Sequence, residues 1–219
     1  MGKSASLFQK WVGKAYQWAT ELLYHPFAWA YEWVAWMVSF GNWGQWRRDA
    51  LDYLQTGSVL EVGFGTGELL ITMVELDFDV IGMEFSPEMH RVTWRKLKRR
   101  GINAKRVRAR TEAIPLPSGS FNNIISTFPS NYIAREETLG EIFRVLNDGG
   151  KAIVVGLGVH FKSSLRRWLT GWFLEDKRGL MIRFLSHEAE KVGFKTEILT
   201  HDTATYALPI LILERNNAD

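Results

Sequence analysis

A glycine-rich loop and an acid that follows it are the first features of the sequence that could do chemistry. The loop runs Glu61-Val62-Gly63-Phe64-Gly65-Thr66-Gly67 and leads into an apolar run that begins at Leu69. Alternate glycines let a backbone turn tightly beneath a ligand, and the unpaired N–H groups of a following helix point at that ligand. Glu84 ends the next apolar run, where a carboxylate can accept hydrogen bonds from ribose hydroxyls. The pattern therefore predicts a nucleoside-containing ligand.

The loop does not fit a dinucleotide such as NAD. The dinucleotide fingerprint needs glycine or alanine three residues after its second glycine, and Glu68 stands three residues after Gly65. A carboxylate is badly placed beside a pyrophosphate, which argues against NAD. For Glu84, the alternative of an ordinary solvated acid at a strand end stays open.

The pattern of apolar and polar residues along the chain predicts the strands and helices that must position this loop. Short β-branched runs at 59–62, 79–83, 123–126 and 152–155 alternate with helical segments near 68–77, 87–100 and 135–146. Buried strands separated by helices indicate a parallel sheet covered on both faces. A helix near 185–192 precedes two strand-like runs, Phe194-Leu199 and Tyr206-Leu213, which we expect to form an antiparallel hairpin.

Composition narrows the class of protein. The chain has 219 residues, is 46% hydrophobic and 23% charged, contains no cysteine and carries a formal net charge of +3. These values are typical of a folded globule and exclude thiol catalysis, zinc fingers and iron–sulfur clusters. We expect no metal site and a cytoplasmic location, with the membrane surface as an alternative. The oligomeric state is left open.

Four ordered blocks together resemble the class I S-adenosylmethionine-dependent methyltransferases. They are the loop at 61–67, Glu84, the Leu-Pro block at 113–121 and Arg144-Val145-Leu146-Asn147-Asp148-Gly149-Gly150. The resemblance covers residues 58 to about 157 and implies S-adenosylmethionine as the cofactor. It also implies a three-layer, Rossmann-like α/β fold with a seven-stranded, mostly parallel sheet whose last strand is antiparallel.

The resemblance assigns roles around that cofactor. Gly63 and Gly65 would lie beside the methionine moiety, Glu61 near its ammonium, and Glu84 on the ribose. Phe85 would contact the adenine, whose edge would meet Thr111 and Glu112. The expected cofactor-binding residues are Tyr31, Glu61, Gly63, Phe64, Gly65, Gly67, Glu84, Phe85, Thr111, Glu112 and Thr127.

One departure concerns the adenine edge. Relatives often carry Gly-Asp-Ala ahead of the Leu-Pro block, whereas this chain has Ala109-Arg110-Thr111. A guanidinium offers donors only, so Arg110 cannot accept a hydrogen bond from the adenine amino group. Either Glu112 or a backbone carbonyl takes that role, or the adenine edge is held less specifically.

Candidate catalytic residues follow the predicted strands at 123–126 and 152–155. Methyl transfer from a sulfonium is an in-line displacement in which positioning and exclusion of water can suffice without a strong base. Thr127-Phe128-Pro129-Ser130 lacks the Asn/Asp-Pro-Pro-aromatic signature of enzymes that methylate amide or base nitrogens. Tyr132 and His160 lie at the carboxyl edge of the predicted sheet and are our candidates. Ordinary packing at the rim is the alternative for both.

The N-terminal region is expected to be a helical cap. We divide the chain into a cap at 1–55 and a cofactor-binding domain at 56–219. The segment 39–48, preceded by Tyr31-Glu32, resembles the cap of ubiquinone and menaquinone C-methyltransferases, which implies that Tyr31 leans over the cofactor. Seven of the ten tryptophans lie between Trp11 and Trp46. They suit either core packing or a lipid-like acceptor and contact with an anionic membrane.

A basic cluster leaves a second function open. Residues 91–110 carry nine Arg and Lys side chains before Arg110 and no acid. Such a cluster could bind RNA phosphates, but a helix with a solvated basic face explains it equally, and we do not expect nucleic acid as the partner. The sequence therefore predicts methyl transfer to a small or lipid-like acceptor. The alternatives are an RNA methyltransferase and a catalytically silent cofactor-binding scaffold.

Overall fold

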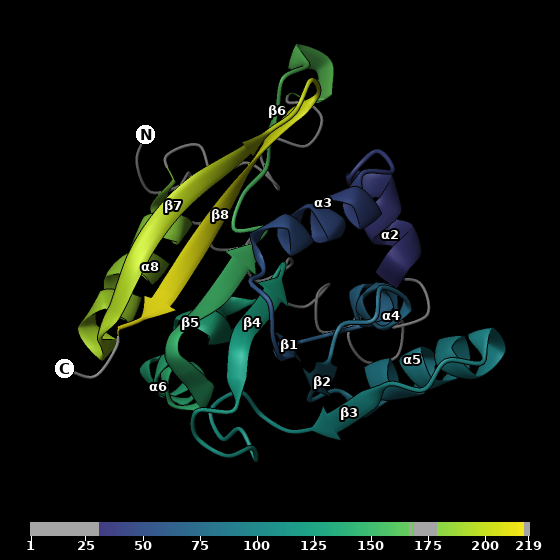
Figure 1. The fold of residues 1–219 in the computed structure, drawn as a ribbon. Helices are drawn as coiled ribbons and strands as arrows, with labels where there is room; N and C mark the ends of the chain where they lie inside the picture. The colour runs from purple at the N-terminus through teal and green to yellow at the C-terminus, as the bar shows by residue number, and fades with distance from the viewer. Residues whose placement is uncertain (1–30, 167, 169–178, 217–219) are drawn as a thin grey trace, which may run out of the picture.

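A mixed β-sheet with helices on both faces forms the body of the structure (Figure 1). The structure is a computed structural model that describes residues 31–166, 168 and 179–216. Within these residues the sheet has eight strands, and the order along its main path is β3-β2-β1-β4-β5-β8-β6, with β7 paired to β8. The predicted α/β architecture with a mostly parallel sheet is confirmed.

The parallel half of the sheet positions the glycine loop. Its strands are β1 (Val59–Val62), β2 (Val80–Glu84), β3 (Lys105–Arg108), β4 (Phe121–Thr127) and β5 (Leu146–Val155). β1 lies between β2 and β4, and the strand order runs outward from it in both directions. Ligands of open parallel sheets bind at the carboxyl ends of the strands where the order reverses in this way. The loop after β1 therefore occupies that position.

The antiparallel hairpin completes the sheet. β7 (Phe194–Asp202) pairs with β8 (Tyr206–Arg215), and β8 also pairs antiparallel with β5 from Lys151 to Val155. The expected number of seven strands is corrected to eight by β6 (His160–Phe161), which pairs with the first residues of β8. β8 extends beyond its pairing with β5, so its free backbone groups bind this short extra strand.

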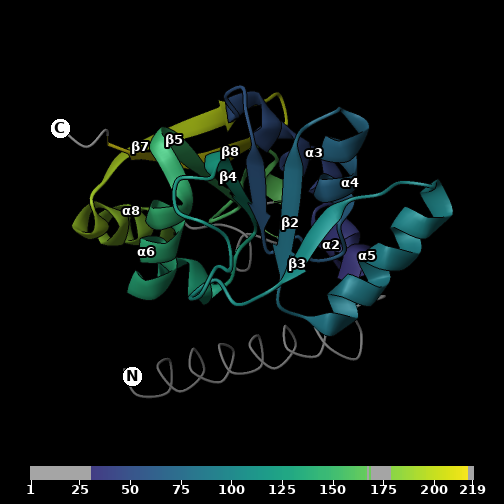
Figure 2. The same cartoon turned by 60° about the horizontal axis from the view of Figure 1, so that its bottom comes forward.

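Helices cover the two faces of the sheet and enclose two hydrophobic clusters. One face carries α3 (Trp43–Asp49), α4 (Glu68–Glu75) and α5 (Pro87–Arg100), and the other carries α6 (Glu136–Val145) and α8 (Leu180–Val192) (Figure 2). Short 3₁₀ turns at Ala50–Tyr53 and Asn131–Ala134 precede β1 and α6. The result is the three-layer arrangement that alternating strands and helices predict.

The described part of the N-terminal region packs onto this body. It begins with α2 (Tyr31–Val38), and α3 follows after a turn in which Phe40 and Gly41 have positive φ angles. Trp46 of α3 is fully buried in the same hydrophobic cluster as α4. The division into a cap at 1–55 and a domain at 56–219 stays a prediction, because residues 1–30 lie outside the described part. Among the described helices, none is both long and apolar enough to cross a bilayer.

Candidate functional site

The glycine loop is held between two side chains from other elements. A Cβ atom on Gly67 (φ +77°) would lie 2.3 Å from a methyl carbon of Thr93 on α5, and one on Gly63 (φ +75°) would lie 2.5 Å from the Tyr132 hydroxyl oxygen. The Thr93 hydroxyl donates to the carbonyl of Gly65 at 3.1 Å. Any larger residue at Gly63 or Gly67 would collide with these groups and strain the backbone. At Gly65, in contrast, an added Cβ would meet open space.

Glu84 joins the end of β2 to this loop. Its Oε2 accepts a hydrogen bond from the Gly65 N–H at 3.1 Å, and its Oε1 accepts from the N–H groups of Phe85 and Ser86 at 2.8 Å each. A carboxylate has about four acceptor positions, so one is left for a ligand. The carboxylate is therefore fixed beside the open side of the loop, where the sequence predicts a ribose.

Two arginines lie over Phe85, the residue expected against an adenine. The guanidinium carbon of Arg110 is 4.4 Å from the centre of the Phe85 ring, and that of Arg108 is 5.7 Å away. Arg108 also donates to the Phe85 carbonyl at 3.0 Å. Arg110 therefore contacts the predicted adenine region by stacking on Phe85. This contact was not predicted, because only the hydrogen-bond donors of Arg110 were considered in the sequence analysis.

Glu112 and Thr111 are tied to α6 and its start. Arg135, just before α6, forms an ion pair and hydrogen bond with Glu112, and the Thr111 hydroxyl donates to Glu112 at 3.3 Å. Burial raises the pKa of Glu112, but hydrogen bonds from its own backbone N–H and from Arg135 outweigh this and hold the pKa below its usual value. The carboxylate that could replace the expected aspartate is thus already engaged by a cation.

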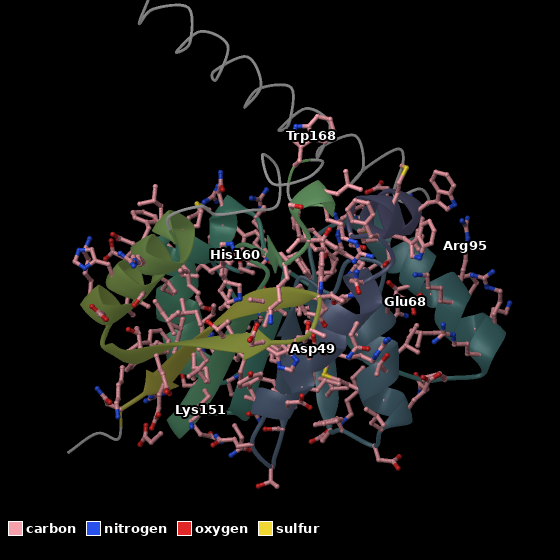
Figure 3. The ribbon with its side chains drawn as sticks, turned by 90° about the horizontal axis from the view of Figure 1, so that it is seen from above. Asp49, Glu68, Arg95, Lys151, His160 and Trp168 are labelled. Carbon is pink, nitrogen blue, oxygen red and sulfur yellow. The ribbon has the colours of Figure 1, made fainter. Side chains whose placement is uncertain are left out.

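The two candidate catalytic residues lie on different elements. Tyr132 lies on the 3₁₀ turn after β4, with its hydroxyl against Gly63 as described. Thr127 ends β4 opposite Val155 and is half-buried. His160 lies on β6 opposite Ala207, and Figure 3 labels it above the β7–β8 hairpin. The structure therefore brings Tyr132 to the loop and attaches His160 to the antiparallel hairpin.

Glu61 is a carboxyl group inside the protein. It is 2% exposed, and its Oε2 is buried without a hydrogen-bond partner among the described residues. Burial raises its pKa to about 8, the charge of Arg47 opposes that rise, and the charge of Glu84 adds to it. An unsatisfied buried carboxyl oxygen is costly, so a ligand that brings a cation to Glu61 would be stabilised.

Several residues of this region were not assigned by the sequence analysis. Trp43 of α3 stacks on Phe128, which directly follows β4, with ring centres 3.9 Å apart. Arg47 was noted only as part of a Trp-Arg match, and Thr93 was not noted. Helical spacing could have placed Trp43 and Arg47 on one face, since they are four residues apart. The predicted role of Tyr31 cannot be compared, because its side chain lies outside the described residues.

Part of the basic cluster at 91–110 is neutralised by acids from other elements. Lys96 pairs with Glu68 at 2.7 Å, Arg100 pairs with Glu68 and Glu75, and Lys105 pairs with Asp79 at 3.0 Å. Arg95 lies at the rim of the molecule in Figure 3. This arrangement matches the solvated helix face more closely than a phosphate-binding surface.

Comparisons with known proteins agree on one domain family. Residues 59–150 match the family model of a methyltransferase domain. The chain is 33% identical over 125 residues to the demethylmenaquinone methyltransferase of Thermus thermophilus, covering 54% of this chain and 57% of that protein. It is 33% identical over 115 residues to the uncharacterized methyltransferase YdaC of Bacillus subtilis, covering 50% and 61%. The matches thus span less than two thirds of either relative.

The fold has solved counterparts as well. A methyltransferase from Pyrococcus furiosus superposes with a TM-score of 0.58 at 22% identity, covering 80% of this chain and 83% of that one. At this identity the likeness concerns the fold.

Proposed function

We propose that the chain, whose residues 59–150 match the model of a methyltransferase domain, is a class I S-adenosylmethionine-dependent enzyme that transfers a methyl group from this cofactor to a small or lipid-like acceptor. The observation that carries the proposal is the bond from the Gly65 N–H to Glu84. This bond fixes a ribose-binding carboxylate beside an open backbone loop at the point where the strand order reverses. The buried, unpartnered Oε2 of Glu61 fits the ammonium of the same cofactor.

The chain's own residues position and enclose the reaction. When bound, S-adenosylmethionine supplies an electrophilic methyl group whose transfer leaves a neutral thioether. Glu84 would hold the ribose through its remaining acceptor position, and Gly65 would let the backbone approach the cofactor closely. The Tyr132 hydroxyl, which lies against Gly63, can orient the acceptor or accept a hydrogen bond from it. His160, which lies on β6, is the second candidate catalytic residue.

Aromatic side chains support an apolar acceptor. The stacked rings of Trp43 and Phe128 lie where α3 meets the carboxyl end of β4, where they would help to exclude water from a bound acceptor. A relative that matches about half of this chain is a demethylmenaquinone methyltransferase, whose name indicates a quinone acceptor. An apolar ring compound is therefore the acceptor class that we favour, and contact with an anionic membrane would give access to it.

Calorimetry with S-adenosylmethionine tests the cofactor assignment. Glu84→Ala removes a charge-assisted hydrogen bond of about 1.5–3 kcal/mol, so we expect at least tenfold weaker binding. Glu88→Ala is the matched control, because Glu88 is a nearby acid whose carboxylate pairs with Arg91 on the same helix. Unchanged affinity in Glu84→Ala, or tight binding of NAD by the wild type, would overturn the assignment.

A labelling experiment tests methyl transfer itself. Purified protein would be incubated with methyl-labelled S-adenosylmethionine and a fractionated cell extract. We expect label in the lipid or small-molecule fraction. Label in RNA would favour the nucleic-acid alternative, and cofactor binding without any transfer would favour the silent scaffold.

A further inference from the structure

One face of α5 contacts the glycine loop and the strand end beside it. His90 and Thr93 lie one helical turn apart and therefore on the same side of this helix. The Thr93 hydroxyl donates to the Gly65 carbonyl at 3.1 Å. The His90 ring packs edge-on against Phe64 with ring centres 4.9 Å apart, and its Nε2 lies 3.0 Å from the carbonyl oxygen of Glu84. This face of α5 therefore holds the loop and the end of β2 together.

The packing of α5 does not require the hydroxyl of Thr93. Thr93 is fully buried, and Met89 and Leu97, one turn away on either side, are buried apolar residues. Valine has the same shape and would fill this place without bringing a polar group into the interior. The hydroxyl donates its hydrogen to the loop rather than to a carbonyl of its own helix. The feature that distinguishes this threonine from valine is therefore its contact with Gly65.

Hydrogen bonds hold both backbone polar groups of Gly65. Its N–H donates to Glu84 Oε2 at 3.1 Å, and its carbonyl accepts from Thr93. Gly65 has a φ of +53°, and an added Cβ there would meet open space, so packing does not restrain this side of the residue. Glycine also has more backbone freedom than any other residue. The two hydrogen bonds therefore fix the peptide planes on the two sides of Gly65.

We propose that Thr93 is a positioning residue for the cofactor, because its hydroxyl holds the peptide between Gly65 and Thr66 in the orientation that keeps the loop open to the ligand. This inference rests on the proposed function and adds a residue of α5 that acts through the loop. Without the hydroxyl, the Gly65 carbonyl loses its partner and the glycine can adopt other conformations. Cofactor binding would then have to order the loop, so affinity would fall.

Calorimetry with S-adenosylmethionine tests this role in variants that differ by one chemical group. Thr93→Val keeps the shape and removes the hydroxyl, whereas Thr93→Ser keeps the hydroxyl and removes the methyl group. We expect Thr93→Val to bind about tenfold more weakly than the wild type and Thr93→Ser to bind within about threefold of it. Thr196→Val is the matched control. The Thr196 hydroxyl donates to Glu190 at 2.6 Å and lies on β7, so its loss should leave the affinity unchanged.

Hydrogen exchange in the cofactor-free protein separates a local effect on the loop from a general effect on stability. A looser loop breaks the bond from the Gly65 N–H to Glu84 more often. We therefore expect the Gly65 amide to exchange about tenfold faster in Thr93→Val than in the wild type. The amide of Ile153, in the buried strand β5, should keep its rate. An equal acceleration of both amides would mean that Thr93 stabilises the whole fold, and the positioning role would be wrong.

The binding outcomes also separate this inference from the cofactor assignment. Unchanged affinity in Thr93→Val, or an equal loss in Thr93→Val and Thr93→Ser, would overturn the role of the hydroxyl alone. Should Thr93→Val fail to fold, Thr93→Ala takes its place, because it differs from Thr93→Ser by the hydroxyl alone. Equal affinities in that pair would contradict the inference in the same way. Failure of the wild type to bind S-adenosylmethionine would instead overturn the proposed function and this inference with it.

Discussion

Two kinds of residue make up the site: the loop glycines and Glu84 form an open backbone loop with a fixed carboxylate beside it, whereas Glu61 is a buried carboxyl group. The loop glycines and Glu84 were identified by type and spacing, because backbone turns and ribose binding place strict demands on both. The environment of Glu61 could not be predicted in this way. Its burial and the missing partner of its Oε2 depend on the tertiary packing around β1, which involves residues far apart in the sequence. The effect of the Arg47 charge on Glu61 could not be predicted for the same reason.

The raised pKa of Glu61 predicts how stability depends on pH. The folded protein holds a proton on Glu61 up to about pH 8, whereas the unfolded chain releases it near its ordinary value of 4.5. Between these values the folded state binds more protons, so the free energy of unfolding falls as pH rises, by up to about 1.4 kcal/mol per pH unit. Glu61→Gln should remove this fall, as urea denaturation at several pH values would detect.

Two further measurements test whether Glu61 causes this pH dependence. Glu197→Gln is the control, because Glu197 is exposed on β7 and its replacement should leave the slope unchanged. Saturating S-adenosylmethionine should flatten the wild-type slope, since an ammonium at Glu61 favours the ionised form. A slope that is identical in the wild type and in Glu61→Gln would show that Glu61 is ionised in the folded protein.

The stack of Arg110 on Phe85 gives a second prediction at this scale. A cation over an exposed ring contributes about 0.5–1 kcal/mol, so Arg110→Ala should change cofactor affinity by no more than about threefold to fivefold. Phe85→Ala should weaken it by about tenfold, because base-to-aromatic stacking is worth about 1–3 kcal/mol. Calorimetry of both variants would measure these affinities. A larger loss of cofactor affinity in Arg110→Ala than in Phe85→Ala would mean that Arg110, and not Phe85, is the main contact of the adenine.

At the scale of elements, strands with continuous apolar sequences were predicted well, whereas a charged strand at the sheet edge was missed. β1 was predicted with its observed bounds, and α5 also begins and ends where the sequence indicates. Ser86 caps α5 by accepting from the Met89 N–H, Pro87 begins it, and Gly101 ends it in a left-handed conformation. β3 was missed as a strand because its sequence, KRVR, lies at the sheet edge and is only partly buried.

The junction of α3 with the sheet is the element-scale feature that most affects stability. Trp46 is fully buried, and its ring centre lies 5.9 Å from that of Phe128 and 5.7 Å from those of Phe161 and Tyr206. Trp46→Ala would leave a large cavity, so we expect a loss of about 3–5 kcal/mol in the free energy of unfolding. Trp94→Ala, at an exposed position of α5, should cost less than about 1 kcal/mol. Equal losses in urea denaturation would mean that α3 does not pack as the structure indicates.

Over the whole molecule, several exposed apolar side chains lie on α2, on the turn after it and on the segment after β6. Trp33 is 68% exposed and Trp168 is 78% exposed, and Figure 3 shows Trp168 projecting from the body of the molecule. The turn after α2 contacts this region, because the Phe40 ring packs on Phe161 of β6 and lies 5.2 Å from the guanidinium carbon of Arg166. We use the name apolar patch for the exposed apolar side chains of these segments, which are Trp33, Trp36, Met37, Phe40, Leu165 and Trp168. Indoles beside a cation are typical of side chains that enter a membrane interface.

Liposome flotation tests whether this apolar patch contacts a membrane. We expect the wild type to float with anionic vesicles at low salt and to float less as salt screens its cations. Each buried indole contributes about 1.5 kcal/mol or more, so replacing Trp36 and Trp168 together by serine should weaken partitioning by about a hundredfold. Trp94→Ser is the control, because Trp94 is exposed on α5, outside the patch. If the wild type stays with the unbound protein at low salt, the membrane is excluded as the partner of the patch. An acceptor would then have to reach the site through water, while the cofactor assignment would stand on its own measurements.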